Sequence, residues 1–543
     1  MPRSRLGFSH VDAGAGLEHP SPPSKAAKTP GRRRKFRHRL VAKLRHFSPS
    51  LRSVASKNSI FLDFCYFRAV NKQRDVARIM KSKSLVLPFA ATVLLASCTV
   101  GPDYSEPRIE LPARFVNGQS SALADASQTA WWTAFGDPVL NQLVDIGLRQ
   151  NLDVLAAVQR IETARAFAGA TGVPAQIDGG ASLDTRRAKG PNGQITEPNT
   201  ATADAFFVFD LFGRYRRERE GALANIEAAQ FDAGTVRLAY IAELIDAYNQ
   251  ARFFREASAI TQQSIASRRR SLGFVQRKAD AGEATDLEQA QARSLLATAQ
   301  AGAPILQGRY EQNVFRIATL VAQPADVVFQ HMKPSRGQLR PRGATPTGVP
   351  ADILRNRPDV RSAERNFAAA TARVGVTEAQ LYPSLSLEGA VTGGSVDTWS
   401  FGPSLVLPVL KRPLLLANRR AAMSSAKEAE LVWRNSVLQA VEETQSSLAL
   451  VRQWARQVSA FQRAANAARE VQGLSRESYE IGGSSLLDVI DAERLSFENR
   501  LSLATSIRDW TSSYVRLQVS TGKGWLVGVD KYYVIKRDGR ATN

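Results

Sequence analysis

The stretch "AGEATDLEQAQARSLLA", residues 281–297, returns 200 residues later as "IGGSSLLDVIDAERLSF", residues 481–497. The matching positions are Gly282 with Gly482, Leu287 with Leu487, Glu288 with Asp488, Ala292 with Ala492 and Leu295 with Leu495. A second pair, "NLDVLAAVQRIETA" at 151–164 and "RPDVRSAERNFAAA" at 357–370, matches at an offset of 206. Because self-similarity at a fixed spacing is typical of duplicated units, we predict two copies of one unit of roughly 200 residues.

The spacing of the prolines predicts long helices in each copy. No proline lies between Pro198 and Pro304, and none follows Pro413. An interior proline costs a helix about 3 kcal/mol, so proline-free windows favour unbroken helices. We expect one long helix at 214–280 and another at 414–480, each roughly 100 Å long. Shorter helices are expected at 138–172, 284–322, 350–381 and 486–520, so two of them placed end to end would match one long helix.

Apolar residues on the predicted helices recur at alternating steps of 3 and 4, the spacing of coiled-coil packing. The stripes are Val441, Thr444, Leu448, Val451, Ala455 and Val458, and Ile507, Trp510, Tyr514 and Leu517. The core of a soluble helical bundle would show the same stripes. They therefore indicate helix packing without deciding between the two arrangements.

Four segments between the helices alternate apolar and polar residues with a period of two. They are "QIDGGASLD" (176–184), "ATADAFFVFDLF" (201–212), "SLSLEGAV" (384–391) and "FGPSLVLPV" (401–409). In the first of them, Ile177 and Leu183 alternate with Asp178 and Asp184. Alternation over about 9 to 11 residues is typical of transmembrane β-strands. A half-buried hairpin on a soluble domain is the alternative.

Four membrane strands in one chain predict an assembly of several copies. An open sheet edge cannot lie in lipid, because its backbone N–H and C=O groups find no partner there. Outer membrane barrels have at least about 8 strands, a limit that both a dimer and a trimer satisfy. Only the trimer, with about 12 strands, leaves an open bore.

The stretch "MKSKSLVLPFAATVLLASC", residues 80–98, has the layout of a bacterial secretory signal, with Lys81 and Lys83 before an apolar run and small residues after it. The run is too short for a membrane-spanning helix, which needs about 20 apolar residues. Its end resembles the lipobox of bacterial lipoproteins, which implies S-diacylglycerol and an N-acyl chain on Cys98. Thr99, in place of Asp, implies sorting to the outer membrane. A buried core helix is the alternative.

The basic charge of the chain is concentrated before Cys98. Residues 1–97 carry 20 of the 72 Lys and Arg but 4 of the 50 Asp and Glu, which leaves 52 basic and 46 acidic residues in the mature chain. That balance is ordinary, so the overall net charge of +22 does not predict a nucleic-acid partner. We interpret residues 1–79 as an over-called start or a disordered leader, because a plausible signal sequence follows them.

Residues that could support catalysis or bind a metal are scarce after residue 97. His331 is the one histidine and Cys98 the one cysteine there, so we expect neither a histidine metal site nor an intrachain disulfide. The sequence contains no G-x-S-x-G, H-E-x-x-H or G-x-x-x-x-G-K-[ST] motif. We predict no catalytic residue, no metal and no cofactor besides the covalent lipid.

Five stretches together resemble the outer membrane lipoproteins of tripartite efflux pumps, the TolC-like family with its NodT-type members. They are "CTVGPDYSEP" (98–107), "WWTAFGDPVLNQLVDIGLRQNLDV" (131–154), "FDLFGRYRRERE" (209–220), "NRPDVRSAERNFAAATARVGVTEAQLYPSLSL" (356–387) and "GKGW" (522–525). The resemblance implies a mostly α chain with membrane β-strands that forms a homotrimer. In it a 12-stranded transmembrane β-barrel continues into a long 12-helix periplasmic α-barrel.

The same resemblance implies a function. The trimer would be a passive conduit that exports small molecules such as drugs or toxic compounds from the periplasm or pump to the outside. Its partners would be a periplasmic adaptor, an inner-membrane pump of the proton-driven RND type and outer membrane lipids. The protein would be lipid-anchored in the outer membrane and extend into the periplasm. A structural or adhesive coiled-coil outer membrane lipoprotein is the alternative.

The resemblance also assigns roles near two helix-to-helix turns. Asp488 and Asp491, three residues apart on one helical face, are implied to form the narrowest ring of the pore, where carboxylates of three copies would bind cations and raise one another's pKa. An ordinary solvated helix face is the alternative. Tyr479 and Glu288 are implied to hold the closed end by a hydrogen bond. The residues implied to dock the adaptor are Gly282, Thr285, Leu287, Gly482, Ser485 and Leu487.

These inferences divide the chain into six segments. They are the basic leader 1–79, the signal peptide 80–97, a lipid-anchored N-terminal segment 98–137, a first repeat 138–330, a second repeat 350–525 and a mobile C-terminal tail 526–543.

Overall fold

The computed structural model describes residues 99–116, 118, 123, 125–197, 199–334, 337–342, 347–394 and 396–528. All of them belong to one compact unit, Thr92–Asn543. The predicted leader, the signal peptide, Cys98 and residues 529–543 lie outside the described residues.

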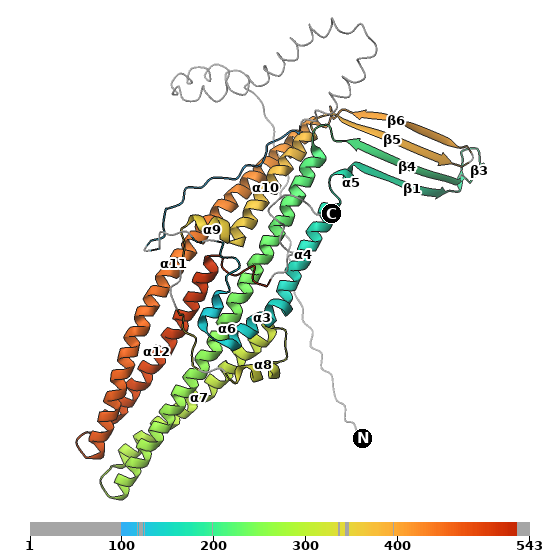
Figure 1. Ribbon diagram of the computed structural model, residues 1–543. Helices are drawn as coiled ribbons and strands as arrows, with labels where there is room; N and C mark the ends of the chain where they lie inside the picture. Colours follow the sequence, from blue (N-terminus) through green and yellow to red (C-terminus); the bar gives the residue numbers. More distant parts are fainter. Residues whose placement is uncertain are drawn as a thin grey trace, which may run out of the picture. The chain divides into compact units, whose positions relative to one another are not determined.

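Two long helices dominate the described chain, α6 at Arg214–Asp280 and α11 at Arg412–Glu480 (Figure 1). Each turns back into a shorter antiparallel helix, α7 at Asp286–Leu320 and α12 at Leu486–Ser520. The two hairpins pack internally, and α12 also packs against α6. The bounds predicted for these four helices are confirmed to within 2 residues.

Two predicted helices are wrong, because each is broken in two. The segment predicted at 138–172 forms α3 (Pro138–Gln150) and α4 (Leu152–Gly169), since Asn151 has an extended backbone with ψ 127°. The segment predicted at 350–381 forms α9 (Ala351–Asn356) and α10 (Pro358–Ala379). Arg357 breaks it with ψ 120°, because a residue before proline is disfavoured in the helical region.

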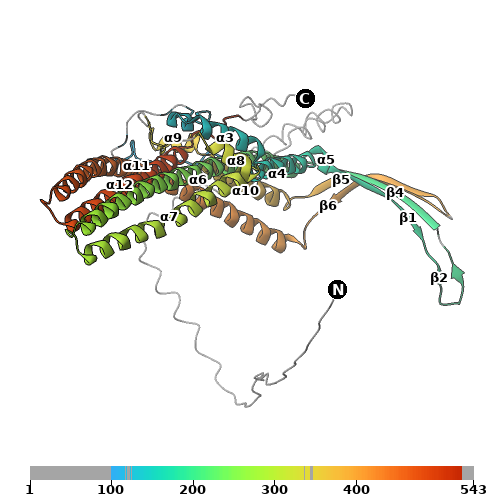
Figure 2. The ribbon, with the colours of Figure 1, turned by 90° about the horizontal axis from the view of Figure 1, so that it is seen from below.

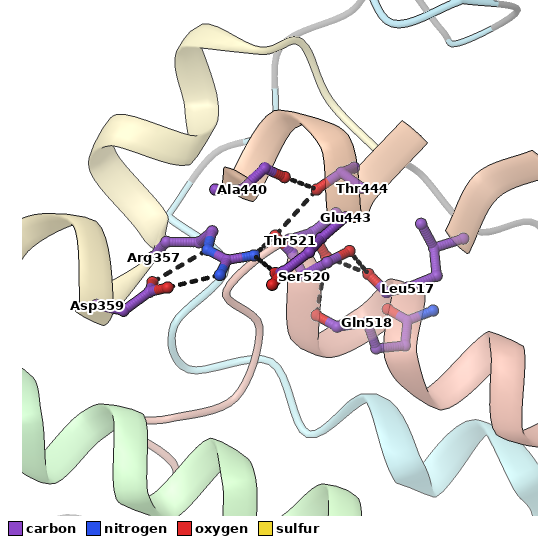
Figure 3. A network of polar contacts seen from close by, with 9 residues as sticks. All are labelled: Arg357, Asp359, Ala440, Glu443, Thr444, Leu517, Gln518, Ser520 and Thr521. Atoms are coloured by element: carbon purple, nitrogen blue, oxygen red, sulfur yellow. Dashed lines mark hydrogen bonds and ion pairs between the residues drawn. The ribbon is translucent and has the colours of Figure 1, made fainter. Parts of the chain in front are cut away.

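Both breaks are joints between helices that follow one another in space. At the first, the Asn151 amide nitrogen donates to the carbonyl oxygen of Leu320 at the end of α7, at 2.9 Å. At the second, Arg357 Nη1 donates to the carbonyl oxygen of Ser520 at the end of α12, at 3.2 Å (Figure 3). The short helices α7 and α4 therefore continue one another, as do α12 and α10, and α4 and α10 both pack against α6.

The second joint is also fixed by charge. The Arg357 guanidinium, buried in the protein, pairs with Asp359 at 2.5 Å and with Glu443 of α11 at 2.7 Å (Figure 3). Thr444, on the next position of α11, donates to the same Ser520 carbonyl at 3.2 Å. Three helices are therefore tied together where α12 ends and α10 begins.

The largest apolar core lies around the middle of α6. It includes side chains of η2 (Trp131–Phe135), of α3 and of α8 (Ala325–Met332), together with the end of α12. The Phe135 and Tyr514 rings meet edge to face at 5.5 Å. The described residues continue past Trp525 to residue 528, and Arg237 Nη2 donates to the carbonyl oxygen of Val527 at 2.5 Å.

An antiparallel sheet in the order β1-β4-β5-β6 lies beyond one end of the helices, opposite the two hairpin turns (Figures 1 and 2). Its strands are β1 (Ile177–Thr185), β4 (Asn199–Phe209), β5 (Ser384–Gly393) and β6 (Thr398–Val406). The four segments predicted from alternation are thus strands. A small hairpin, β2 (Ala188–Lys189) with β3 (Ile195–Thr196), lies in the connection between β1 and β4. A short helix, α5 (Val173–Gln176), leads into β1.

The register gives the sheet one polar and one apolar face. Asp178 pairs with Phe206, Asp184 with Thr200 and Asp204 with Ala390, which places these carboxylates on one face because side chains alternate along a strand. The opposite face includes Ile177, Leu183, Phe207, Leu385, Leu387, Val391, Trp399, Phe401 and Leu405. Several of these apolar side chains are exposed in the single chain, with Trp399 at 79% and Leu183 at 78%.

Candidate functional site

The turn between α6 and α7 is built by a glycine and a capping box. Gly282 has φ 77°, a conformation that favours glycine, and its N–H donates to the carbonyl oxygen of Ala279 at 2.9 Å. Thr285 then begins α7: its hydroxyl accepts from the Glu288 N–H, and the Glu288 carboxylate accepts from the Thr285 N–H at 2.8 Å. Leu287 lies between them in the sequence and is 66% exposed.

The turn between α11 and α12 has the same construction. Gly482 has φ 79°, and Ser485 forms a capping box with Asp488, whose carboxylate accepts from the Ser485 N–H at 2.9 Å and from its hydroxyl at 2.8 Å. Leu487 is 59% exposed. Each turn therefore presents one exposed leucine in the first turn of a capped helix. All six residues predicted to dock a partner lie at these two turns.

Asp488 and Asp491 lie on the first two turns of α12. The bonds from the Ser485 hydroxyl and backbone N–H lower the pKa of Asp488, because they favour its charged form. Asp491 faces Arg494 at 3.3 Å and is mostly exposed. Within one subunit both carboxylates thus lie at the surface, exposed to solvent. A ring of them in several subunits stays a prediction.

Tyr479 and Glu288 do not form a hydrogen bond within the subunit. The Tyr479 ring is 7% exposed and lies against Phe274 at 5.5 Å, with Lys278 Nζ 4.7 Å from its centre. Its hydroxyl has no partner among the described residues. Burial raises the pKa of Tyr479, and the negative charge of Glu288 raises it further. The gate pair stays a prediction.

One contact that sequence reasoning missed fastens residues 99–104, which we call the N-terminal strap. The buried Arg217 guanidinium donates to the carbonyl oxygen of Val100 at 3.3 Å and to that of Gly101 at 3.4 Å, and it pairs with Asp103 at 2.6 Å. The strap also packs against α10. A Cβ atom added to Gly101 would lie only 2.5 Å from the Cα of Gly375, so the two backbones are in close contact.

Both ends of the strap are held. At its start, Val100 N–H donates to the carbonyl oxygen of Phe212 at 3.2 Å, just after β4 ends. At its end, the Tyr104 hydroxyl donates to Glu364 of α10 at 2.5 Å, and burial and this bond raise the pKa of Tyr104. The sequence carried one signal for this contact, the run of arginines in "FDLFGRYRRERE". A buried arginine side chain needs hydrogen-bond or ion-pair partners, so burial of one of these arginines requires such a contact.

No group of three or more His, Cys, Asp or Glu side chains in the described part of the chain is placed to hold a metal ion. Among the described helices, none combines the length and the apolar character that a membrane-spanning helix requires.

Comparison with known proteins identifies the family whose pattern these features follow. The family model described as "Outer membrane efflux protein" matches residues 143–323 and 349–523. Nodulation protein T of Rhizobium leguminosarum bv. viciae is 36% identical to the chain over 448 residues, which are 80% of the chain and 92% of that protein. The solvent efflux pump outer membrane protein SrpC of Pseudomonas putida is 30% identical over 476 residues, 82% of the chain and 99% of that protein.

Solved structures show the same fold. The outer-membrane channel OprN is 31% identical, with a TM-score of 0.71 over 79% of the chain and 100% of OprN. The open state of the MtrE outer membrane channel of Neisseria gonorrhoeae is 25% identical, with a TM-score of 0.69 over 79% of the chain and 99% of MtrE.

Proposed function

The chain belongs to the outer membrane efflux protein family and is an outer membrane channel component of a tripartite efflux pump, not an enzyme, and we propose that it works as a homotrimer. Three copies of the four-stranded sheet would close one 12-stranded barrel in the outer membrane. The helices would continue this barrel into the periplasm.

The main support for a trimer is that both edges of the four-stranded sheet lack a neighbouring strand among the described residues. Within the described strands, β1 pairs only with β4 and β6 only with β5, so each has one side without a ladder. The adjoining face is apolar, which fits lipid, but an unpaired strand edge in lipid leaves its backbone groups without hydrogen bonds. Pairing β6 of one copy with β1 of the next removes every edge and turns the polar face inward.

The joints support the helical part of the proposal. Each chain supplies four helical rows, namely α6, α11, α7 continued by α4, and α12 continued by α10. Three chains would give the 12 rows of an α-barrel. The equivalent positions of Asn151 and Arg357 support two internal repeats, which agree with the two segments that the family model matches.

A conduit of this kind needs partners at its periplasmic end. We propose that the turns at 281–285 and 481–485 dock a periplasmic adaptor, which joins the channel to an inner-membrane pump of the proton-driven RND type. Relatives named for solvent efflux, toluene efflux and pyoverdine export support small molecules as cargo. The exposed Leu287 and Leu487 supply the apolar contact that a helical partner would cover.

We further propose that Cys98 carries the lipid that anchors the trimer. The strap holds Thr99 beside the start of α6, where a Cβ on Gly213 would lie 2.7 Å from Thr99 Cγ2. That position is close to the end of β4, so an acyl chain on the preceding residue would enter the membrane that surrounds the sheet. Cys98→Ser should abolish acylation, and intact mass spectrometry of the mature N-terminus measures it; an unmodified N-terminus at another residue would contradict the anchor.

The trimer is tested on full-length protein extracted from its native membrane. Cross-linking should give three-subunit species, and the extracted protein should form ion-conducting channels in planar bilayers. Co-purified cross-linked proteins should include an adaptor and an inner-membrane pump. A well-folded monomer without conductance would overturn the proposal.

A further inference from the structure

An open groove lies on the apolar face of the sheet, near the middle of its strands. Small residues form its floor, Ala203 and Ala205 on β4 and Gly389 on β5. The Trp399 and Phe401 side chains of β6 border it, and the Phe401 ring lies 3.4 Å from the place where a Cβ atom of Gly389 would be. Its volume is about 500 Å³. That volume lies in the range of about 300 to 1,000 Å³ that is typical of sites for small molecules.

The strand register makes the groove apolar. Ala205 pairs with Gly389, and Gly389 pairs with Phe401, so these residues lie on one face of the sheet. Asp204 also borders the groove, but side chains alternate along a strand, which directs its carboxylate to the opposite, polar face. The apolar face is the one that lipid contacts in the proposed barrel. An open apolar groove on that face fits an acyl chain.

The N-terminal strap begins near the end of the same strand. Val100 N–H donates to the carbonyl oxygen of Phe212, shortly after β4 ends. The Phe212 ring stacks at 4.6 Å on that of Tyr382, which lies just before β5. Aromatic rings gather at the membrane boundary of outer membrane barrels, so we take this pair to mark where the hydrocarbon begins. Cys98 directly precedes Thr99 in the sequence, so a lipid on it would start at that level.

The groove lies within reach of an acyl chain that starts at this boundary. From Phe209, where β4 ends, to Ala203 the strand rises about 20 Å, which covers about 15 Å of membrane depth at a tilt of about 40°. One leaflet is half of a hydrocarbon core of about 30 Å. A chain as long as one leaflet therefore ends at the groove. On its way it would pass the Phe207 and Phe209 rings, which meet edge to face at 5.0 Å.

We propose that an acyl chain of the Cys98 lipid lies along the apolar face of β4 and ends in the groove formed by Ala203, Ala205 and Gly389. The inference rests on the proposed lipid anchor. A free lipid of the outer membrane has the same chemistry. The chain on Cys98, however, is covalently held near β4, so its local concentration at the groove does not depend on the exchange of lipids. The lipid is then part of the outer surface of the sheet and not only a tether.

The experiment identifies what the end of the acyl chain touches. Cells that make the full-length protein are supplied with a fatty acid that carries a diazirine near its methyl end, and their outer membranes are irradiated before the protein is purified. Trypsin then releases the N-terminal peptide 98–108, while the groove residues lie on peptides 190–214 and 374–411. We expect mass spectrometry to find peptide 98–108 joined through its lipid to one or both of the groove peptides.

Filling the groove should displace the chain. We expect Ala205→Leu/Gly389→Leu to lower the yield of joined peptides severalfold. The matched control is Ala201→Leu/Gly393→Leu, which adds the same side chains to a directly paired position on the same face of β4 and β5, outside the groove. This control should keep the yield of the parent. If the groove variant fails to assemble, Ala203→Leu fills the groove from β4 alone and should also lower the yield.

Three other outcomes overturn the inference. If peptide 98–108 carries acyl chains but is joined to other parts of the chain, or if the groove variants keep the yield of the parent, the groove does not hold this lipid and the anchor stands. If the groove peptides carry whole phospholipids instead of peptide 98–108, a free lipid occupies the groove. If the N-terminus of the parent carries no acyl chain, both the inference and the lipid anchor fail.

Discussion

The Asn151 amide nitrogen lies 2.9 Å from the carbonyl oxygen of Leu320, 169 residues away. The amide oxygen of the same side chain accepts from the N–H groups of Asp153 and Val154, at 3.0 and 3.1 Å. Asn151 thus caps the beginning of α4 and satisfies a free carbonyl group at the end of α7. Helix ends leave such groups without intrahelical partners, so one side chain stabilises two helices at once.

We expect Asn151→Ala to destabilise the subunit by about 1 to 3 kcal/mol, because it removes an N-cap and leaves a buried carbonyl group unpaired. Thermal or urea unfolding of the purified protein measures this as a lower midpoint. Asn313→Ala is the control, since the Asn313 amide donates to Arg309 within its own helix on an exposed face. Equal midpoints for the two variants would show that the joint contributes nothing.

The strands and long helices could be predicted because their signals are local. Alternation with a period of two fixes which side chains share a face of the sheet, and Ile177, Leu183, Asp178 and Asp184 lie as that pattern requires. The absence of proline fixed where α6 and α11 could run. Both signals need only neighbouring residues.

The joints and the strap could not be predicted because they depend on residues far apart. The break at Asn151 carried a local signal, an Asn followed by an acidic residue, that is typical of an N-cap. Its bond to Leu320 has no such signal, and neither has the contact of Arg217 with Asp103, 114 residues apart. The hydrogen bond from Ser267 of α6 to Glu493 of α12 spans 226 residues and was missed for the same reason.

We expect Asp488→Asn/Asp491→Asn to weaken the block of channel conductance by divalent cations. If three copies bring these carboxylates together around one axis, removing their charge removes the attraction for cations. Single-channel recordings with increasing Mg²⁺ or Ca²⁺ measure the block. Glu498→Gln is the control, because it also removes a carboxylate that pairs with Arg494. Glu498 lies one helical turn beyond Arg494 on α12, on the side away from Asp491. A block that persists in the double variant would place both aspartates outside the ring.

We expect this block to be lost on acidification, at a pH that depends on Ser485. Because the Ser485 bonds lower the pKa of Asp488, the charged form persists to lower pH in the folded protein than in the unfolded chain. This carboxylate therefore contributes stability above its unfolded pKa and loses it as the pH falls through the folded value. Ser485→Ala removes the hydroxyl donor, so the pKa rises and the block should disappear at a higher pH than in the parent.

The control for this shift in pH is a variant in the turn between α6 and α7. Thr285→Ala removes the same kind of N-cap from α7. There the hydroxyl forms its hydrogen bond with Glu288 and not with Asp488. A general loss of helix stability would shift the pH midpoint of the block in both variants. A shift confined to Ser485→Ala assigns the titration to Asp488.

We expect Arg217→Ala to release the N-terminal strap while the helices and the sheet stay folded. The variant loses the bonds to Val100 and Gly101 and the ion pair with Asp103, which are contacts of the strap and not of the sheet. Arg108 follows the strap and is exposed, so trypsin should cleave after it several times faster in the variant. Mass spectrometry of the released N-terminal peptide measures the rate, and Arg219→Ala, an exposed arginine on the same helix, is the control. If both variants are cleaved at the same rate, Arg217 does not hold the strap, and the contacts of Tyr104 with Glu364 and of Val100 with Phe212 suffice to fasten it.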